Sequence, residues 1–292
     1  MGLVTGLGAA SMIRGADNAT RLIGIAAFAI LAFFFLAPLA FMVIVSFYKA
    51  DPMAFYQATF TMENYEKYFS SFYLNVTLRS LWSAGLSAVI VVALGFMTVL
   101  AIVELSRRWQ LFWVILLLAL MCISEVIIGF SWLILLSESA GIPKLLETIG
   151  LWSDPRSLSP SFGAMMIGLV TLGLSIVALV LFPELANRDR SIEEAALTLG
   201  TPPNRVMWNI TLPIFAPTLV ALTLTMFVYL LGVFVMPTML GRPSDWTMTV
   251  MISDKAMGDA NLPLGAALAV AMLLITGVIL LLSSVVSRRQ SA

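Results

Sequence analysis

The sequence offers few side chains that could do acid–base, nucleophilic or metal chemistry. It contains no histidine and a single cysteine, Cys122, which lies inside an apolar run. Without histidine the chain lacks the usual general base and the commonest metal ligand, and one cysteine can form neither an intrachain disulfide nor a cysteine metal site. No glycine-rich loop ending in Lys-Ser or Lys-Thr occurs, so no phosphate loop is present. These absences predict a protein that is not an enzyme, with no catalytic and no metal-binding residue.

One acid, Glu125, lies inside a long apolar stretch. A charge at the centre of a membrane helix costs roughly 2.5–3.5 kcal/mol on insertion scales, so such a residue normally faces protein or water. Glu125 is therefore a candidate for lining a solute path and meeting a cationic group. Three alternatives stay open: the carboxyl is protonated, it is paired with a neighbouring helix, or it lies nearer the membrane surface.

The segment over residues 191–203 has the start and stop signals of a short helix. Ser191 is placed to act as N-cap, and Glu194 follows three residues later, as in a capping box. Gly200 supplies a C-terminal stop, with Pro202 and Pro203 beyond it. We therefore predict a helix over residues 191–199.

This helix carries one apolar face. Ile192, Ala195, Ala196 and Leu199 fall at i, i+3, i+4 and i+7, while Glu193 lies off that stripe. About two turns of helix are marginal in water, so another surface must hold them. That surface is the chain's own helix ends, lipid headgroups or a partner protein, and the pattern alone does not decide among them.

A longer spacing pattern in the same segment resembles a known signature. Glu194-Ala195-Ala196, three residues, Gly200, nine residues and then the segment 210–213 resemble the EAA signature of ABC importer permeases. The resemblance implies a coupling helix seated in a groove of a cytoplasmic ATPase. Glu194, Ala195, Ala196 and Gly200 carry over by position, and Ile192 and Leu199 complete the apolar face. Glu194 can also stabilise the helix as a cap, and the two roles are compatible.

Other segments are similar to the spermidine/putrescine-type permeases, a group that includes importers of opines. These segments are residues 234–241 and 261–269, and the resemblance runs from about residue 44 to the C-terminus. Ser124, Glu125 and the later Trp132 also resemble residues of these relatives, which implies a place in the solute path. Where many relatives have Pro-Trp before the serine and an arginine after the acid, this chain has Met121-Cys122 and residues 127–129.

These residues must be positioned by helices that cross a membrane. The 292 residues are 60% hydrophobic and 11% charged, and the mean hydropathy is +1.00, far above that of a soluble domain. A membrane helix needs about 20 mostly apolar residues. About six such stretches occur, at approximately residues 22–48, 78–103, 111–136, 162–182, 214–240 and 263–286. We predict an all-α integral membrane protein, and the resemblance implies the type I ABC importer permease fold, with the short helix between spans four and five.

Basic residues in the short connections favour cytoplasmic termini, because such residues concentrate on the inner side. We expect a cytoplasmic segment over residues 1–21, one permease domain over 22–287 and a cytoplasmic tail over 288–292, in a bacterial inner membrane. The arginines on the expected inner side are Arg14, Arg21, Arg107, Arg108, Arg188, Arg190, Arg205, Arg288 and Arg289.

The family resemblance implies a machine of several subunits. It implies an ATPase dimer that binds ATP and Mg, a second and different permease subunit, and a periplasmic solute-binding protein, while the net charge of +0 gives no reason to expect nucleic acid. We expect alternating-access import of a small polar, amine-bearing solute such as a polyamine or an opine. The alternatives are an amino-phosphonate, thiamine or another small organic solute in the same class of importer, or a secondary transporter, which would need more ionisable groups at mid-membrane.

Overall fold

The computed structural model describes residues 5–51, 54–153 and 156–290, with side chains beginning at Gly24. Parts of the expected terminal segments 1–21 and 288–292, including the side chains of Arg14, Arg21, Arg288 and Arg289, lie outside what is described. Within the described ranges the regular secondary structure is helical apart from one small hairpin. Five helices are long and apolar enough to cross a membrane, or six if one bent pair is a single span. The predicted all-α membrane architecture of about six spans is therefore confirmed.

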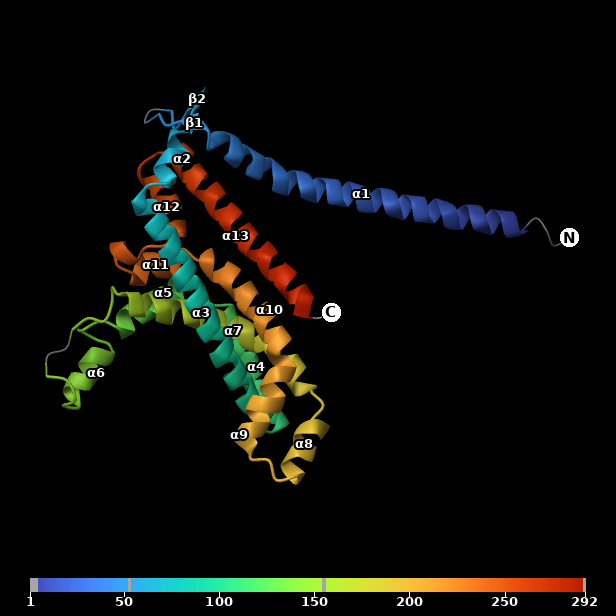
Figure 1. Ribbon diagram of the computed structural model, residues 1–292, viewed down its shortest axis with the longest axis vertical. Helices are drawn as coiled ribbons and strands as arrows, with labels where there is room; N and C mark the ends of the chain where they lie inside the picture. The colour runs from blue at the N-terminus through green and yellow to red at the C-terminus, as the bar shows by residue number, and fades with distance from the viewer. Residues whose placement is uncertain (1–4, 52–53, 154–155, 291–292) are drawn as a thin grey trace.

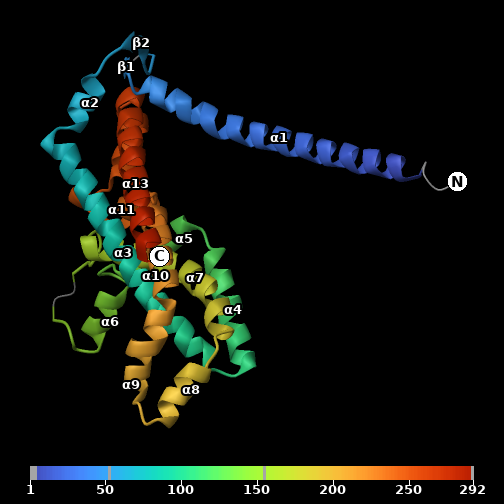
Figure 2. The ribbon, with the colours of Figure 1, turned by 45° about the vertical axis from the view of Figure 1, so that its right-hand side comes forward.

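The first helix, α1 (Thr5–Val45), projects away from the rest of the molecule and meets it near its C-terminal end, against α13 (Leu262–Gln290) (Figures 1 and 2). It leads into an antiparallel hairpin of β1 (Tyr48–Lys49) and β2 (Gln57–Phe60), followed by α2 (Glu63–Tyr68). The buried Asn64 side chain donates hydrogen bonds to the carbonyls of Ser46 and Tyr48, both at 2.9 Å, and so ties α2 to the end of α1. This part of the molecule is called the hairpin end.

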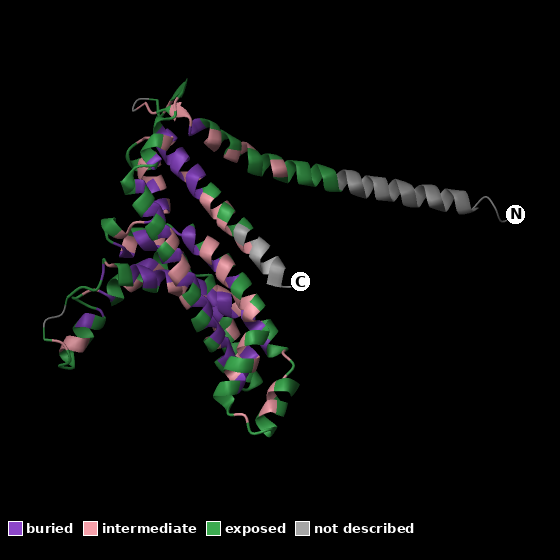
Figure 3. Cartoon of the chain, viewed as in Figure 1, coloured by how far each residue is buried: buried purple, intermediate pink, exposed green. Residues whose placement is uncertain are grey.

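The core lies where α3 (Ser71–Val103) packs against α7 (Phe162–Ala186) and α10 (Leu212–Leu231). Small residues allow these helices to approach closely, as is usual in membrane bundles. A Cβ atom at Gly95 of α3 would lie only 2.5 Å from Val177 Cγ1 of α7, so the contact requires glycine. In Figure 3 many buried residues lie in this bundle, whereas α8 and the coloured part of α1 show mainly exposed residues.

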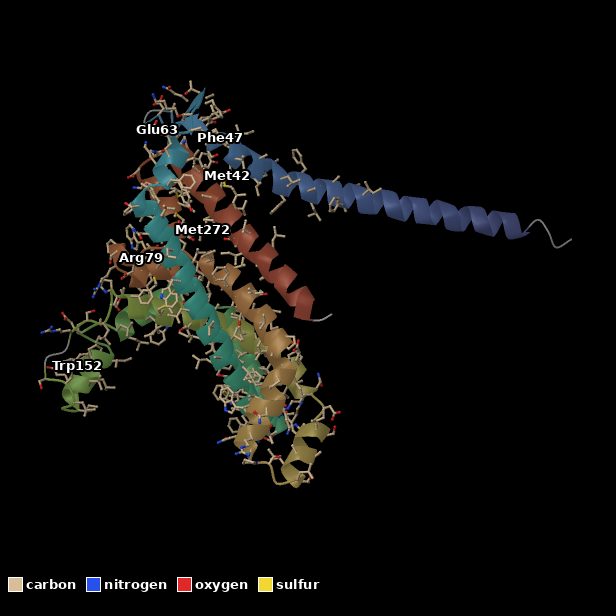
Figure 4. The ribbon with its side chains drawn as sticks, in the orientation of Figure 1. Met42, Phe47, Glu63, Arg79, Trp152 and Met272 are labelled. Atoms are coloured by element: carbon tan, nitrogen blue, oxygen red, sulfur yellow. The ribbon has the colours of Figure 1, made fainter. Side chains whose placement is uncertain are left out.

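The third predicted span is broken. Residues 111–136 were expected to form one helix, but the structure has α4 (Arg107–Met121) and α5 (Glu125–Leu135), bent by 98° at the three intervening residues. No proline or glycine marks this break in the sequence. After α5, the short helix α6 (Ile142–Thr148) and the following loop with Trp152 project to one side, away from the helix that carries Arg79 (Figure 4).

After α7 the chain reaches the end of the molecule that lies opposite the hairpin (Figure 1). This end is called the α8 end. There α8 (Ser191–Thr198) and α9 (Pro203–Val206) precede the π-helical turn η1 (Met207–Thr211), which runs into α10. The fifth span thus extends over Pro203–Leu231 and ends before Gly232, whereas residues 214–240 were expected. The remaining elements are α11 (Val235–Leu240), η2 (Pro243–Asp245), α12 (Met248–Ser253), η3 (Asp254–Gly258) and α13 (Leu262–Gln290).

Candidate functional site

The helix α8 begins and ends close to its predicted bounds, but its N-terminus is built differently. The residue at the N-cap position is Arg190, and no side chain caps the helix, so the predicted capping box of Ser191 and Glu194 is wrong. Instead the Ser191 backbone N–H donates to the Asp189 carboxylate at 2.9 Å, and this bond lowers the pKa of Asp189 below its ordinary value. Because Asp189 accepts the hydrogen bond from the Ser191 N–H, Ser191 is the first residue of the helix and not its N-cap.

The C-terminus of α8 is a glycine cap, as predicted. Gly200 has φ of +83°, a left-handed conformation that glycine adopts without steric cost. Its N–H bonds to the Leu197 carbonyl at 3.0 Å, and the Thr201 N–H bonds to the Ala196 carbonyl at 3.1 Å. This pair of bonds is the Schellman motif, which satisfies the last carbonyls and fixes where the chain turns.

The apolar face of α8 is not covered by the described residues of this chain. No residue of α8 is buried, and Ile192 and Leu199 are 54% and 87% exposed. Ala195 is exposed and Ala196 half-buried. Packing of this face onto the chain's own helix ends, one of the sequence-based alternatives, is therefore not found in the described part of the molecule.

One polar side chain of α8 does reach the rest of the molecule. Glu193 receives a hydrogen bond from Thr211 Oγ1 of η1 at 2.9 Å on one carboxylate oxygen, and its other oxygen lies 3.4 Å from Arg188 Nη2. The side chains of Arg188 and Glu193 are only 10% and 14% exposed. Glu193, which lies off the apolar stripe, thus points into the molecule while Glu194 remains exposed.

Arg188 extends this contact to a third element. Its Nη2 also lies 3.2 Å from Glu104 Oε1, at the residue that caps the end of α3, and Arg190 Nη2 lies 3.1 Å from the same oxygen. Sequence reasoning did not identify these contacts, because Glu104 and Arg188 are 84 positions apart and no spacing rule joins them. The five residues that meet here, called the Arg188 cluster, are Glu104, Arg188, Arg190, Glu193 and Thr211.

The second candidate region lies at the break between α4 and α5. Glu125 is the first residue of α5, and the Val126 backbone N–H donates to Ser124 Oγ at 3.4 Å, so Ser124 caps this helix. The acid expected well inside a continuous span therefore occupies a helix N-terminus, where the helix dipole favours negative charge. Glu125 itself is half-buried.

The Tyr229 hydroxyl of α10 lies close to the Glu125 carboxyl, a proximity that the sequence gave no reason to expect. Trp132 lies seven positions after Glu125, and its Nε1–H donates to Thr171 Oγ1 of α7 at 3.1 Å. The structure thus brings Ser124, Glu125 and Tyr229 together, while the Trp132 indole is bonded to α7.

A cavity of about 260 Å³ with a mixed polar and apolar lining lies elsewhere, against α3, and is lined by Arg79, Trp82, Ser83, Phe162 and Asp245. The Arg79 guanidinium donates to the backbone carbonyl of Ser244 at its edge. None of the predicted path residues lines this cavity, so it is separate from the Glu125 region.

Comparison with a family model matches residues 183–292 to the binding-protein-dependent transport system inner membrane component. The matched part contains α8, the Arg188 side of the cluster and every helix that follows. The chain is 24% identical over 245 residues to a spermidine/putrescine transport system permease protein PotB of Haemophilus influenzae, covering 84% of this chain and 86% of that protein. It is 27% identical over 234 residues to a putrescine transport system permease protein PotI of Escherichia coli, covering 80% of this chain and 79% of that protein.

Solved structures show the same fold. A chain of a bacterial ABC transporter involved in the import of the acidic polysaccharide alginate matches with a TM-score of 0.77 at 19% identity, covering 96% of this chain and 99% of that chain. A chain of an inward-facing methionine ABC transporter matches with a TM-score of 0.52 at 15% identity, covering 76% of this chain and 99% of that chain. At these identities the likeness concerns the arrangement of helices and not the solute.

Proposed function

We propose that this chain, whose residues 183–292 match the binding-protein-dependent transport system inner membrane component, is the permease subunit of an ABC importer and moves a small amine-bearing solute, such as a polyamine or an opine, from the periplasm to the cytoplasm. It is a transport subunit with the type I importer fold and not an enzyme, since in this family the ATPase is a separate subunit. What we propose beyond the family is the solute, the partners and the residues that serve each of them.

We propose that α8 is the coupling helix and docks in a groove of the ATPase that binds ATP and Mg. The observation that carries this role is the uncovered apolar face, on which Ile192 and Leu199 are more than half exposed. Ala195 and Ala196 allow close approach between them, Gly200 fixes the end of the helix, and the exposed Glu194 is free to meet a basic group at the rim. In this arrangement the α8 end and both termini face the cytoplasm.

Transport then follows from two packings of the bundle. When the ATPase dimer closes, it draws α8 toward the coupling helix of the second permease, and the spans shift from an inward-open to an outward-open packing. The nucleotide-bound ATPase can drive this change only if it binds one packing more tightly than the other. The broken helix at α4 and α5 provides backbone that can turn without unwinding a continuous span.

The solute class rests on the half-buried Glu125 at that break. A carboxylate at a helix N-terminus beside the Tyr229 hydroxyl offers an anionic acceptor and a neutral hydroxyl to an ammonium group. A carboxylate in a membrane protein is costly unless it meets protein or a cation, which an amine-bearing solute would supply. The names of the PotB and PotI relatives point to the same solute class.

We further propose that α1 packs against a second, different permease subunit and that a periplasmic binding protein delivers the solute at the hairpin end. Only 6% of the apolar window of α1 is buried within the described chain, so nearly all of its surface is available to a partner. The relatives carry the names of two distinct permeases, which favours a heterodimer over a homodimer.

The coupling role is tested by Gly200→Val in the complete importer. A β-branched residue at positive φ strains the backbone by about 1–3 kcal/mol and displaces the cap of α8, so the ATPase should no longer copurify and uptake should be lost. Gly150→Val is the matched control, because Gly150 has φ of +75° and, like Gly200, open space around it, but follows α6. Equal retention of the ATPase by both variants would argue against docking through α8.

The solute role is tested by Glu125→Gln and Tyr229→Phe in proteoliposomes that contain the whole importer. Uptake of labelled putrescine and spermidine should fall roughly tenfold in Glu125→Gln, because an ammonium group loses its charged acceptor. Glu138→Gln, an exposed acid after α5, is the control and should transport normally. Unchanged uptake in Glu125→Gln, or wild-type uptake of an amine-free solute in preference to both polyamines, would contradict the proposal.

A further inference from the structure

Few side-chain contacts join α8, the helix proposed to receive force from the ATPase, to the membrane-spanning helices. No residue of α8 is buried, and loops join it to α7 on one side and to α9 on the other. Among the described residues, the side-chain hydrogen bonds and ion pairs that join α8 to elements beyond its flanking loops all involve Glu193. A helix attached only by loops could be displaced without moving the spans, so these few contacts decide whether motion is passed on.

We propose that the Arg188 cluster is the link that transmits displacement of α8 to α3 and α10, with Arg188 and Glu193 as positioning residues. This inference rests on the proposed role of α8 as the coupling helix. Glu193 uses one carboxylate oxygen on Thr211, directly before α10, and the other on Arg188. Arg188 in turn reaches Glu104 at the end of α3. A shift of α8 therefore acts on the ends of two core helices at once.

Burial makes this link stiff. The side chains of Arg188 and Glu193 are about nine-tenths buried, so their attraction is screened far less than that of a surface pair. The backbone carbonyl of Leu185 accepts a further hydrogen bond from Arg188 Nη1 at 3.3 Å, which fixes the guanidinium to the end of α7. Arg188 is thus bonded to the ends of α3 and α7 and to α8.

The receiving end of the link is unusual in its backbone. Thr211 closes the π-helical turn η1 and is only 3% exposed. Such turns insert an extra residue into a helix and recur at functional sites. Here the turn lies directly before Leu212, so Thr211 donates to Glu193 from within the span that also carries Tyr229. The path from α8 to the proposed solute region therefore runs along one continuous helix.

The test uses the complete importer in proteoliposomes and measures two rates together, binding-protein-stimulated ATP hydrolysis and solute uptake. Glu193→Gln, Arg188→Gln and Thr211→Val each remove one connection. We expect the ATPase to remain bound and to hydrolyse ATP, while the number of solute molecules moved per ATP falls roughly tenfold, a typical size for coupling between sites. Thr211→Ser keeps the hydroxyl and should retain wild-type coupling.

Arg205→Gln is the matched control for charge, because Arg205 is exposed on α9 at the same end of the molecule. A second measurement follows the geometry directly. Spin labels at Leu105→Cys and Leu197→Cys, both partly exposed, report the distance between the end of α3 and α8 in a Cys122→Ser background. The distance distribution should be narrow in the otherwise unaltered importer and should broaden in Glu193→Gln.

Two outcomes overturn the inference and leave the proposed function standing. One is an unchanged ratio of uptake to ATP hydrolysis in both Glu193→Gln and Arg188→Gln. The other is a parallel loss of uptake, hydrolysis and assembled complex, which a purely structural contact would produce. If the wild-type importer itself fails to retain the ATPase through α8, the proposed function fails, and that retention is measured before any variant.

Discussion

Two spans of this molecule are equally apolar and yet lie in very different surroundings. The windows in Gly24–Val45 of α1 and in Ser71–Val103 of α3 have the same mean hydropathy, 2.8, but 6% of the first and 56% of the second are buried within the described chain. Apolar character is enough to place a helix in a membrane. It does not decide whether the helix packs against protein, because lipid tails are as apolar as the side chains.

Residue size accounts for the difference. The buried face of α3 carries small residues such as Ser80, Ala84 and Ala88, all at most 3% exposed, which let α7 and α10 approach. The described part of α1 carries exposed phenylalanines instead, including Phe28, Phe34 and Phe35. Large aromatic side chains hold a neighbouring helix at a distance unless that helix is shaped to receive them. The helix α3 is therefore built to pack within its own chain, whereas the surface of α1 is left for something else.

The largest effect should come from filling the contact between α3 and α7. In Gly95→Leu the new Cβ would lie 2.5 Å from Val177 Cγ1 and 3.1 Å from Val177 Cβ, so the helices must separate. Overpacking usually costs about 1–3 kcal/mol, and the clash here with a branched side chain on a rigid helix should exceed that range. We expect loss of monodisperse protein in size-exclusion chromatography.

The matched substitution on α1 should do little. A Cβ atom at Gly24 would meet nothing within 4 Å, so Gly24→Leu should leave the elution profile and the thermal midpoint of the isolated subunit unchanged. If Gly24→Leu were as damaging as Gly95→Leu, the contrast between the two spans would be false.

A smaller effect is expected from the aromatic surface of α1. The double variant Phe34→Ala and Phe35→Ala removes side chains that are 72% and 67% exposed, and it should weaken pairing with the proposed second permease by about 2 kcal/mol, as expected for aromatic anchors in an interface. The subunit's own stability should not change. Copurification of the tagged second permease measures the loss.

The control for this prediction is Leu273→Ala with Leu274→Ala, two exposed residues on α13. This variant should pair normally. Normal pairing of the α1 variant as well would show that α1 faces only lipid.

The sequence carried enough information to predict the membrane architecture, because span length and apolarity are local properties. It also predicted the end of α8, since Gly200 and the prolines that follow act within one turn. The break before Glu125 could not be predicted in the same way, because residues 122–124 contain neither proline nor glycine and the apolar pattern continues on both sides. The bend depends on packing of α5 against α7 and α11, which are distant in sequence.

The candidate sites likewise combine features that the local sequence predicts with features that depend on residues distant in the sequence. The exposed face of α8 follows from helical spacing, and the structure leaves it uncovered. The cap at Ser191 was predicted wrongly because Asp189, two positions earlier, competes for the same backbone N–H. Glu193 and Glu194 are neighbours of identical type, and only the position of Arg188 and Thr211 in the folded chain distinguishes the inward acid from the outward one.

The smallest expected effect comes from comparing a buried hydroxyl with an exposed hydroxyl on the same helix, α3. Ser80 Oγ accepts the Met248 backbone N–H at 2.7 Å and donates to the Val76 carbonyl at 2.7 Å, and Ser80 is 1% exposed. Ser80→Ala leaves the Met248 N–H buried without an acceptor, which should cost about 1–2 kcal/mol. Thr98 on the exposed face bonds only to Leu94 of its own helix in the described structure, so Thr98→Val should be nearly neutral. Thermal unfolding in detergent measures both, and equal midpoints would mean that the buried hydroxyl contributes nothing to joining α12 to α3.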